Sequence, residues 1–297
     1  MIPERTSPRE LLARLGRAVD TPVSTDMVRF CEVFERELHH FAEVGVRLDP
    51  PALVTMTLGP GREFGEAVGA FLRDELAFDP VVVEEVLGLQ RSIDDWMLVR
   101  LLTPANGTPE LGLYFRRTMS VARAVDWLAA RGVGIAERAG LAHLGRLLGA
   151  SRTGVLAARL APNEPTLYKV YLHAPSSGDQ DGCRALAPVF DHFQFPRRLW
   201  RPLLDGLDDL GGRGPGDIFV SLTLGDGDVF DSLKLDLFQV HLGALESLLR
   251  RCKLLDETVP SLAGIGRELG LNTAEHCGLA LTPESCTLTA YFVTGAN

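Results

Sequence analysis

The sequence predicts an α+β fold in which a ten-stranded antiparallel β-barrel is surrounded by α-helices. Short segments of alternating polar and apolar residues occur in pairs joined by turns, and five such pairs follow one another with helical segments between them. Because side chains alternate across a strand, each pair has one apolar face, which the helices must cover. A sheet closed into a barrel meets this requirement and leaves no strand edge open.

The clearest hairpin spans residues 154–173, where two strands flank a turn rich in Pro and Asn. Its second strand places Lys169 and Tyr171 on one face and Val170 and Leu172 on the other. Corresponding Tyr or Asp positions in the second strands of the later pairs recur about every 55 to 65 residues. This spacing indicates a repeated unit of two strands followed by helices.

The chain begins with two helical segments, in which apolar residues recur every three to four positions. Ser7 and Pro8 are typical of an N-cap and a first helical residue. The predicted helices are Pro8–Ala18, Thr25–Phe41, Arg62–Leu76, Pro80–Leu89, Val121–Ala130, Leu141–Leu148, Cys183–Phe193, Pro196–Leu207, Leu242–Leu254 and Leu262–Leu269.

Pro, Gly, Asn and Asp residues at 49–51, 103–109, 225–228 and 282–285 supply hairpin turns. No low-complexity linker divides the chain, so we expect a single barrel domain over 1–297, with N-terminal helices in 1–40 and five ββα units in 41–297. The predicted strands are Phe41–Leu48, Leu53–Leu58, Trp96–Leu102, Leu111–Arg116, Gly154–Leu160, Thr166–His173, Asp217–Leu224, Ser232–Phe238, His276–Leu281 and Thr287–Val293.

Composition and charge exclude several classes of protein. A net charge of −9 argues against a general nucleic-acid binder, which needs a basic surface. No apolar run approaches the ~20 residues that span a bilayer, and the charged N-terminus does not resemble a secretory signal. The five scattered cysteines form no CxxC pair, which indicates reduced thiols rather than disulfides or a zinc site. We therefore expect a cytoplasmic, monomeric protein that binds neither nucleic acid nor membranes.

The polar face of the sheet must point into the barrel, because the helices pack on the apolar face. The inward-facing set combines cations, hydroxyls and residues with little side chain, which leaves room inside the barrel for a ligand. The inward-facing residues that carry this prediction are Glu43, Arg47, Thr57, Arg100, Gly112, Tyr114, Lys169, Tyr171, Phe219, Lys234, Asp236, Phe238, His276 and Tyr291.

This pattern resembles the aromatic (ABBA-type) prenyltransferases, whose αββα repeats build the PT barrel. The segment Lys169-Val170-Tyr171 matches the Lys-x-Tyr pattern of that family. The stretch Phe41–Asp49 resembles its first barrel strand, with Glu43 at the position of the catalytic Glu. Length and hairpin order are most similar to the branch that modifies cyanobactin-type ribosomal peptides.

The chain departs from the family pattern at three inward positions. Gly112 stands where the family has Lys, Thr57 where it often has Arg, and the Lys-x-Tyr of the fourth hairpin reads Lys234-x-Asp236. The barrel therefore holds fewer cations than the family pattern implies.

The resemblance implies roles for three groups of residues. Glu43 is expected to take a proton from the acceptor. The residues expected to bind the donor diphosphate are Arg47, Arg100, Lys169, Tyr171, Lys234 and Tyr291. The residues expected to line the prenyl and acceptor pocket are Tyr114, Phe219, Phe238, Gly112 and His276.

The implied reaction transfers an isoprenyl group from an allylic diphosphate, dimethylallyl or geranyl, to a side chain of a cyanobactin-like ribosomal peptide. No DDxxD-type motif or metal-ligand spacing occurs, so no cofactor is expected to be obligatory, and Mg²⁺ remains an optional aid to ionisation. Two alternatives stay open. One is the same transfer to a small indole or phenol, and the other is a non-catalytic barrel that binds an isoprenoid or a peptide.

Overall fold

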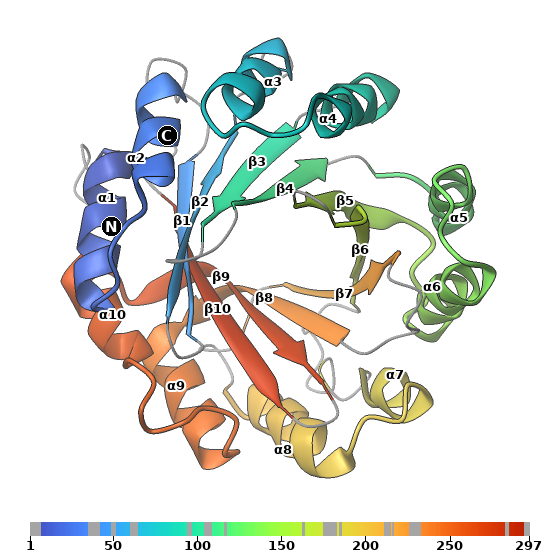
Figure 1. Ribbon diagram of the computed structural model, residues 1–297. Coiled ribbons are helices and arrows are strands. Elements are labelled where there is room, and N and C mark those ends of the chain that lie inside the picture. The colour runs from blue at the N-terminus through green and yellow to red at the C-terminus, as the bar shows by residue number, and fades with distance from the viewer. Residues whose placement is uncertain are drawn as a thin grey trace.

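The computed structural model describes residues 7–34, 42–48, 52–59, 65–93, 97–103, 109–115, 118–161, 164–174, 183, 186–210, 215, 217–225, 233–282 and 285–293. Viewed along the barrel axis, the strands of these residues form a ring and the helices lie outside it (Figure 1). The strands are β1 (Ala42–Arg47), β2 (Leu53–Leu58), β3 (Met97–Leu102), β4 (Glu110–Phe115), β5 (Thr153–Leu160), β6 (Leu167–His173), β7 (Ile218–Leu224), β8 (Leu233–His241), β9 (Thr273–Leu281) and β10 (Cys286–Val293).

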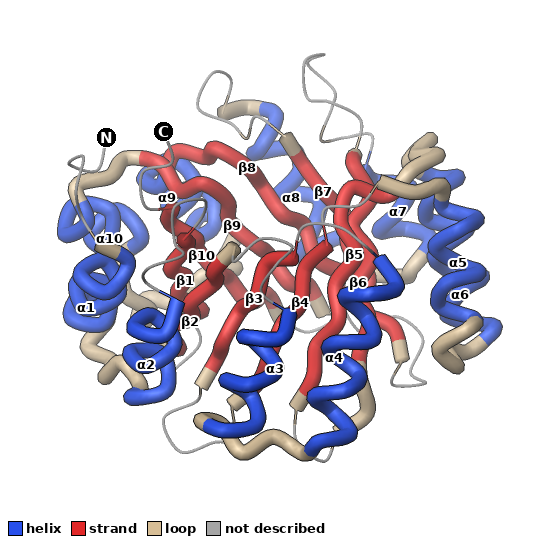
Figure 2. Tube along the Cα trace, turned by 90° about the horizontal axis from the view of Figure 1, so that it is seen from above, coloured by secondary structure: helices blue, strands red, loops and turns tan. Residues whose placement is uncertain are grey.

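The helices follow the strand pairs in the predicted order. After turning the view by 90°, α3 and α4 run along the outside of the barrel with the strands behind them (Figure 2). The helices are α1 (Pro8–Ala18), α2 (Thr25–Phe34), α3 (Gly65–Asp74), α4 (Pro80–Ile93), α5 (Val121–Ala129), α6 (Ile135–Leu147), α7 (Ala187–His192), α8 (Arg197–Asp208), α9 (Leu242–Arg251) and α10 (Leu262–Leu269).

The sheet is a closed barrel with the strand order β1-β10-β9-β8-β7-β6-β5-β4-β3-β2. Every neighbouring pair is antiparallel, and each of the five hairpins pairs with the next one along the chain. Pairing of β1 with β10, in which Gly45 faces Tyr291, closes the ring. The predicted ten-stranded barrel surrounded by helices is confirmed.

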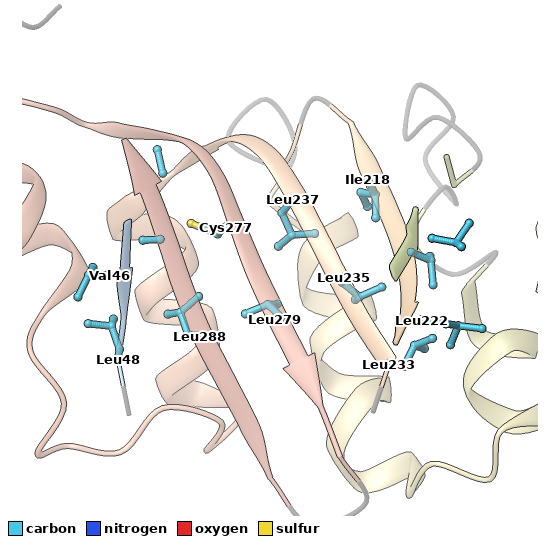
Figure 3. Packing of buried hydrophobic residues seen from close by; sticks show 14 of the residues in the cluster. Val46, Leu48, Ile218, Leu222, Leu233, Leu235, Leu237, Cys277, Leu279 and Leu288 are labelled. Carbon is cyan, nitrogen blue, oxygen red and sulfur yellow. The ribbon is translucent and has the colours of Figure 1, made fainter. Parts of the chain in front are cut away.

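The hydrophobic core lies between the outer face of the barrel and the helices. Val46, Leu235 and Leu279 come from three different strands, and each is 0% exposed. Figure 3 shows these side chains on the outer face of the sheet, together with neighbours from β7 and β10. Burial of such apolar area, at about 25 cal/mol per Å², fixes which face of each strand points outward. The opposite face must then line the lumen.

Several element boundaries differ from the prediction, among them the start of β9, which lies at Thr273 rather than His276, and the end of α4, which lies at Ile93 rather than Leu89. Strand β8 continues to His241 rather than ending at Phe238, because Val240 and His241 still pair with β9. Gln239, between them and Phe238, adopts a φ of 51° and interrupts the alternation of side chains. Helix α6 begins at Ile135, since Glu137 accepts a hydrogen bond from the N–H of Gly134 in a capping box. Helix α7 begins at Ala187, four residues later than predicted.

Some predicted features fall outside the described residues. These are Phe41, Trp96, Arg116 and Ser232, residues 35–40, 62–64 and 184–185, the turn at 49–51, most of the turns at 103–109 and 225–228, and half of the turn at 282–285. In the part of the chain that is described, we find no helix with the length and hydrophobicity that crossing a membrane requires.

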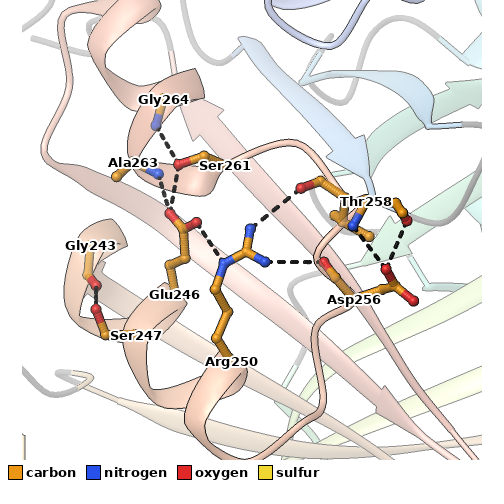
Figure 4. A network of polar contacts seen from close by, with 10 residues as sticks. Gly243, Glu246, Ser247, Arg250, Asp256, Thr258, Ser261, Ala263 and Gly264 are labelled. Carbon is orange, nitrogen blue, oxygen red and sulfur yellow. Dashed lines mark hydrogen bonds and ion pairs between the residues drawn. The ribbon is translucent and has the colours of Figure 1, made fainter.

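The connection between α9 and α10 is held by a partly buried polar network (Figure 4). Glu246 accepts hydrogen bonds from Arg250 at 3.0 Å, Ser261 at 2.8 Å and the N–H of Ala263 at 2.9 Å. Arg250 in turn donates to the carbonyl oxygens of Asp256 and Val259. Burial opposes the charged form of Glu246, but these hydrogen bonds outweigh it and lower the pKa.

Replacing Glu246 by Gln is expected to lower the free energy of unfolding by about 2 kcal/mol, because Arg250 and the N–H of Ala263 lose a charged acceptor. Urea denaturation followed by circular dichroism measures the change. The exposed Glu257→Gln serves as the control and should unfold like the native protein. Equal midpoints for both variants would show that the network contributes nothing to stability.

Candidate functional site

The lumen contains two cavities, which share Arg100 and Tyr114 in their walls. The small chamber has a volume of about 110 Å³ and is lined by Glu43, Thr57, Leu98, Arg100, Tyr114, Val155, Tyr171, Phe219, Asp236, Phe238, Glu275 and His276. The large chamber has a volume of about 370 Å³, and its polar lining residues include Arg47, Thr55, Arg100, Glu110, Tyr114, Arg159, Lys169, Thr223, Lys234, Thr289 and Tyr291.

Arg100 on β3 lies at the junction of the two chambers. Its guanidinium donates to Thr57 Oγ1 at 3.2 Å and to the Tyr291 hydroxyl at 2.9 Å. The same group lies over the ring of Tyr114, 4.7 Å from the centroid, and over that of Tyr291, at 4.5 Å. Cation–π and hydrogen-bonding contacts therefore fix one permanent positive charge at the centre of the barrel.

Glu43 on β1 is a buried carboxylate, 3% exposed, on the small-chamber side of Arg100. One oxygen lies 3.5 Å from an Arg100 nitrogen and the other 3.4 Å from Nδ1 of His276. Burial raises the pKa of Glu43, and the nearby charge of Arg100 opposes this shift only in part. A carboxylate in such surroundings is able to accept a proton from a group placed in the small chamber.

Aromatic rings form one wall of the lumen from β8 across β9 to β10. The imidazole of His276 stacks on Tyr291, with centroids 4.0 Å apart, and on Phe238, at 5.1 Å. Phe238 in turn meets Phe219 edge-on at 5.3 Å. Gly45 leaves space for this stack, because a Cβ there would lie 2.7 Å from Cδ1 of Tyr291.

Lys169 on β6 carries its ammonium into the large chamber. Its Nζ lies 5.5 Å from the centroid of the Tyr171 ring, which itself packs 6.4 Å from Tyr114. Burial, together with repulsion from the charge of Lys234, lowers the pKa of Lys169 to about 7. An anion in this chamber would restore the full charge of the ammonium.

Lys234 and Asp236 on β8 form an ion pair, with Nζ and Oδ1 2.6 Å apart. The Asp236 carboxylate is 2% exposed, and its second oxygen is 3.5 Å from the hydroxyl of Ser221. Burial opposes ionisation of Asp236, but the ammonium of Lys234 outweighs it and lowers the pKa. Gly278 on β9 makes room for the pair, since a Cβ there would overlap the side chain of Lys234.

The structure brings every predicted site residue into the lumen, but it distributes two of them differently from the prediction. Tyr171, which we expected to bind the diphosphate, lines the small chamber rather than the cationic one. Gly112, which we expected in the acceptor pocket, lines the large chamber. Alternation along a strand determines the face on which a residue lies, but the shear of the barrel determines its height along the axis.

Several residues that line the chambers were not among the predicted functional residues, and Asp236, Thr57 and Glu275 are three of them. Asp236 and Thr57 were predicted to face inward, but the ion pair of Asp236 with Lys234 was not predicted. Glu275 lines the small chamber although it is exposed and adjacent to inward-facing His276. No sequence signal identifies it, because alternation would place it on the outer face.

Similarity to known proteins is visible in structure and not in sequence. No protein-family profile matches this chain, and no curated protein sequence does. Prenyltransferase PriB, solved as a ternary complex with L-tryptophan and dimethylallyl thiolodiphosphate, superimposes with a TM-score of 0.66 at 13% identity, covering 98% of this chain and 97% of that one.

Two further solved structures share the architecture. AnaPT from Neosartorya fischeri has a TM-score of 0.62 at 14% identity and covers 97% of this chain and 94% of its own. The 5-dimethylallyltryptophan synthase from Streptomyces coelicolor has a TM-score of 0.53 at 15% identity, with 98% of each chain covered. The fold of this chain is thus the barrel of the aromatic prenyltransferases.

Proposed function

We propose that this protein is a prenyltransferase that moves an isoprenyl group from an allylic diphosphate to an acceptor side chain. The observation that carries the proposal is the joining of a cationic chamber to a chamber that holds a buried carboxylate, with tyrosines between them. Structural similarity to PriB, which binds a dimethylallyl diphosphate analogue, supports the same chemistry.

The diphosphate would occupy the large chamber, where Arg47, Lys169 and Lys234 supply cations. Cleavage of the allylic C–O bond leaves the electron pair on the diphosphate, and fixed cations stabilise the charge that develops there. These side chains can carry out this role without a metal. Mg²⁺ could assist ionisation of the donor but is not required in this mechanism.

The allylic cation would form beside Arg100, at the junction of the chambers. Tyr114 borders both chambers and Tyr291 the large one, so their side chains would exclude water from this position. Tyr171 borders the small chamber, so it would shield the cation from the acceptor side. The acceptor nucleophile attacks the allylic carbon, and Glu43 takes the proton that it releases.

The size of the small chamber supports a side chain as the acceptor. At about 30 Å³ per water molecule, its volume of about 110 Å³ holds roughly four waters, which suits the end of one side chain. Exposed His173, Asp217 and Glu275 surround this end of the barrel. We propose that a peptide, of the cyanobactin type in the branch that the sequence resembles, presents its side chain there.

A second candidate acceptor is a free amino acid, because PriB was solved with L-tryptophan bound. Incubation with dimethylallyl or geranyl diphosphate and a panel of peptides and amino acids separates the two, with prenylation detected by mass spectrometry. Mass gain on a peptide with none on the free amino acids supports the peptide acceptor. Parallel reactions with EDTA or MgCl₂ measure the metal dependence.

Calorimetric titration with dimethylallyl thiolodiphosphate tests the donor site itself. Saturable binding is expected. If neither the dimethylallyl nor the geranyl analogue shows saturable binding, the proposal that the protein is a prenyltransferase is rejected. The alternative that it is a non-catalytic carrier of isoprenyl diphosphates is rejected by the same result.

A further inference from the structure

Negative charge in the lumen is concentrated at one end. Among the described residues, three carboxylates, one guanidinium and one imidazole line the small chamber, namely Glu43, Asp236, Glu275, Arg100 and His276. The large chamber is lined by five cationic side chains and one carboxylate, namely Arg47, Arg100, Arg159, Lys169, Lys234 and Glu110. The two halves of one cavity system thus have opposite charge.

The ion pairs of the lumen are oriented to produce this separation. In the pair of Lys234 with Asp236, the lysine lines only the large chamber and the aspartate only the small one. In the pair of Arg100 with Glu43, the guanidinium borders both chambers and the carboxylate only the small one. Each pair therefore directs its anion toward the small chamber.

Removal of the proton that the acceptor releases requires one base, and the carboxylate of Glu43 supplies it. A second buried carboxylate, Asp236, costs desolvation energy and cancels part of the charge that Lys234 offers to the donor. Glu275 stands at the rim, and it makes no ion pair with any residue that the structure describes. A neutral indole or phenol can donate one hydrogen bond to such a carboxylate, whereas a cationic group makes charge-assisted contacts with both.

The aromatic walls of the small chamber are suited to the same kind of group. Phe219, Phe238 and Tyr171 surround the space next to the carboxylates. Aromatic faces combined with carboxylates form a favourable site for an ammonium or a guanidinium, particularly where water is excluded. The volume of about 110 Å³ accommodates such a head group.

We propose that the acceptor carries a positively charged nitrogen, as an ammonium or a guanidinium, and that this nitrogen is the atom that becomes prenylated. The inference rests on the proposed prenyl transfer and specifies its substrate class. Asp236 and Glu275 attract and orient the cationic group, and Glu43 accepts its proton.

The atoms and charges of the step balance. The nitrogen loses one proton to Glu43, and the lone pair released by that loss forms the new bond to the allylic carbon. The allylic C–O bond breaks, and its electron pair leaves with the diphosphate. The product nitrogen keeps a positive charge, so the carboxylates stabilise the acceptor before and after the transfer.

The test uses one short peptide sequence in which a single position is Arg, Lys, citrulline, norleucine, Trp or Tyr, with dimethylallyl diphosphate as donor. The Arg or Lys peptide is expected to react at least about 10-fold faster than its uncharged counterpart, as a charge-assisted contact predicts. Faster reaction of the Trp or Tyr peptide, or equal rates for Arg and citrulline, would overturn the inference.

Two variants locate the effect. Asp236→Asn and Glu275→Gln are each expected to lower kcat/KM for the cationic peptide by about 10-fold, while the exposed Glu268→Gln on α10 leaves it unchanged. Glu275 lies at the rim, so its variant remains informative if the change at Asp236 prevents folding. Unchanged selectivity in a folded Glu275→Gln protein counts against the assignment.

A measurement of donor binding distinguishes failure of the cationic acceptor from failure of the proposed prenyl transfer. Dimethylallyl thiolodiphosphate should bind Asp236→Asn at least as tightly as the native protein, because Lys234 no longer has an anionic partner. If the protein binds or consumes the donor but prenylates no cationic peptide, only the proposed cationic acceptor is overturned. Absence of donor binding by the native protein overturns both.

Discussion

Replacing Glu43 by Gln is expected to lower kcat by about 10²- to 10⁴-fold, the usual contribution of a positioned general base. Glutamine has a similar shape and can still accept a hydrogen bond from Arg100, so the centre of the barrel should keep its geometry. Donor affinity is expected to stay the same or increase, since Arg100 loses its anionic partner. Single-turnover kinetics and donor titration measure the two quantities separately.

The pH dependence of the native protein should show the same group. Because burial raises the pKa of Glu43, its carboxyl becomes protonated at a higher pH than that of an exposed glutamate. Only the ionised form accepts a proton, so kcat/KM is expected to fall as the pH drops through this raised pKa. The acid limb should vanish in Glu43→Gln and persist in Glu84→Gln, a change at an exposed position on α4. An unaltered rate and profile in Glu43→Gln would exclude it as the base.

Replacing Lys169 by Met is expected to weaken donor binding by about 10- to 100-fold, the effect of losing one charged hydrogen-bond donor to phosphate. Methionine keeps the length and apolar stem of the side chain, so packing against Tyr171 changes little. Arg123→Met on the exposed surface of α5 removes one positive charge from the protein without touching the lumen. Equal donor affinity in the two variants would show that Lys169 does not contact the diphosphate.

The lowered pKa of Lys169 makes donor binding depend on pH. With a value of about 7 in the free protein, the amine loses its proton as the pH rises through neutrality, and donor affinity should fall over the same interval. The diphosphate favours the ammonium, so binding above neutral pH takes up a proton. Calorimetry in buffers with different ionisation enthalpies measures this uptake, and Lys169→Met should abolish it.

The strands of the barrel were predictable because each has one apolar face, and burial of that face determines the orientation of the whole strand. Val170 and Leu172 are fully buried under the helices, as their alternation with Lys169 indicated. The helix α6 was predicted too short, although Gly134 followed by Glu137 is a recognisable N-terminal signal. The extension of β8 was not predictable, since nothing in the sequence identifies Gln239 as the residue that adopts a positive φ.

The site was predicted less completely than the fold because its members come from distant strands. Alternation correctly placed Glu43, Arg100 and Lys234 inside the barrel. It gave no information on the height of each residue along the axis, which depends on strand register and tilt. The division of the lumen into chambers of opposite charge follows from those heights, and only the closed barrel reveals it.

Closure of the sheet by β1 and β10 has a consequence for the biogenesis of the protein. The first strand, with Glu43, reaches the ribosome exit long before its partner exists, so its edge stays unsatisfied throughout translation. Pairings between segments this distant in sequence form slowly, since the entropy of loop closure must be overcome first. The closed lumen therefore forms only once β10 has been synthesised and docked.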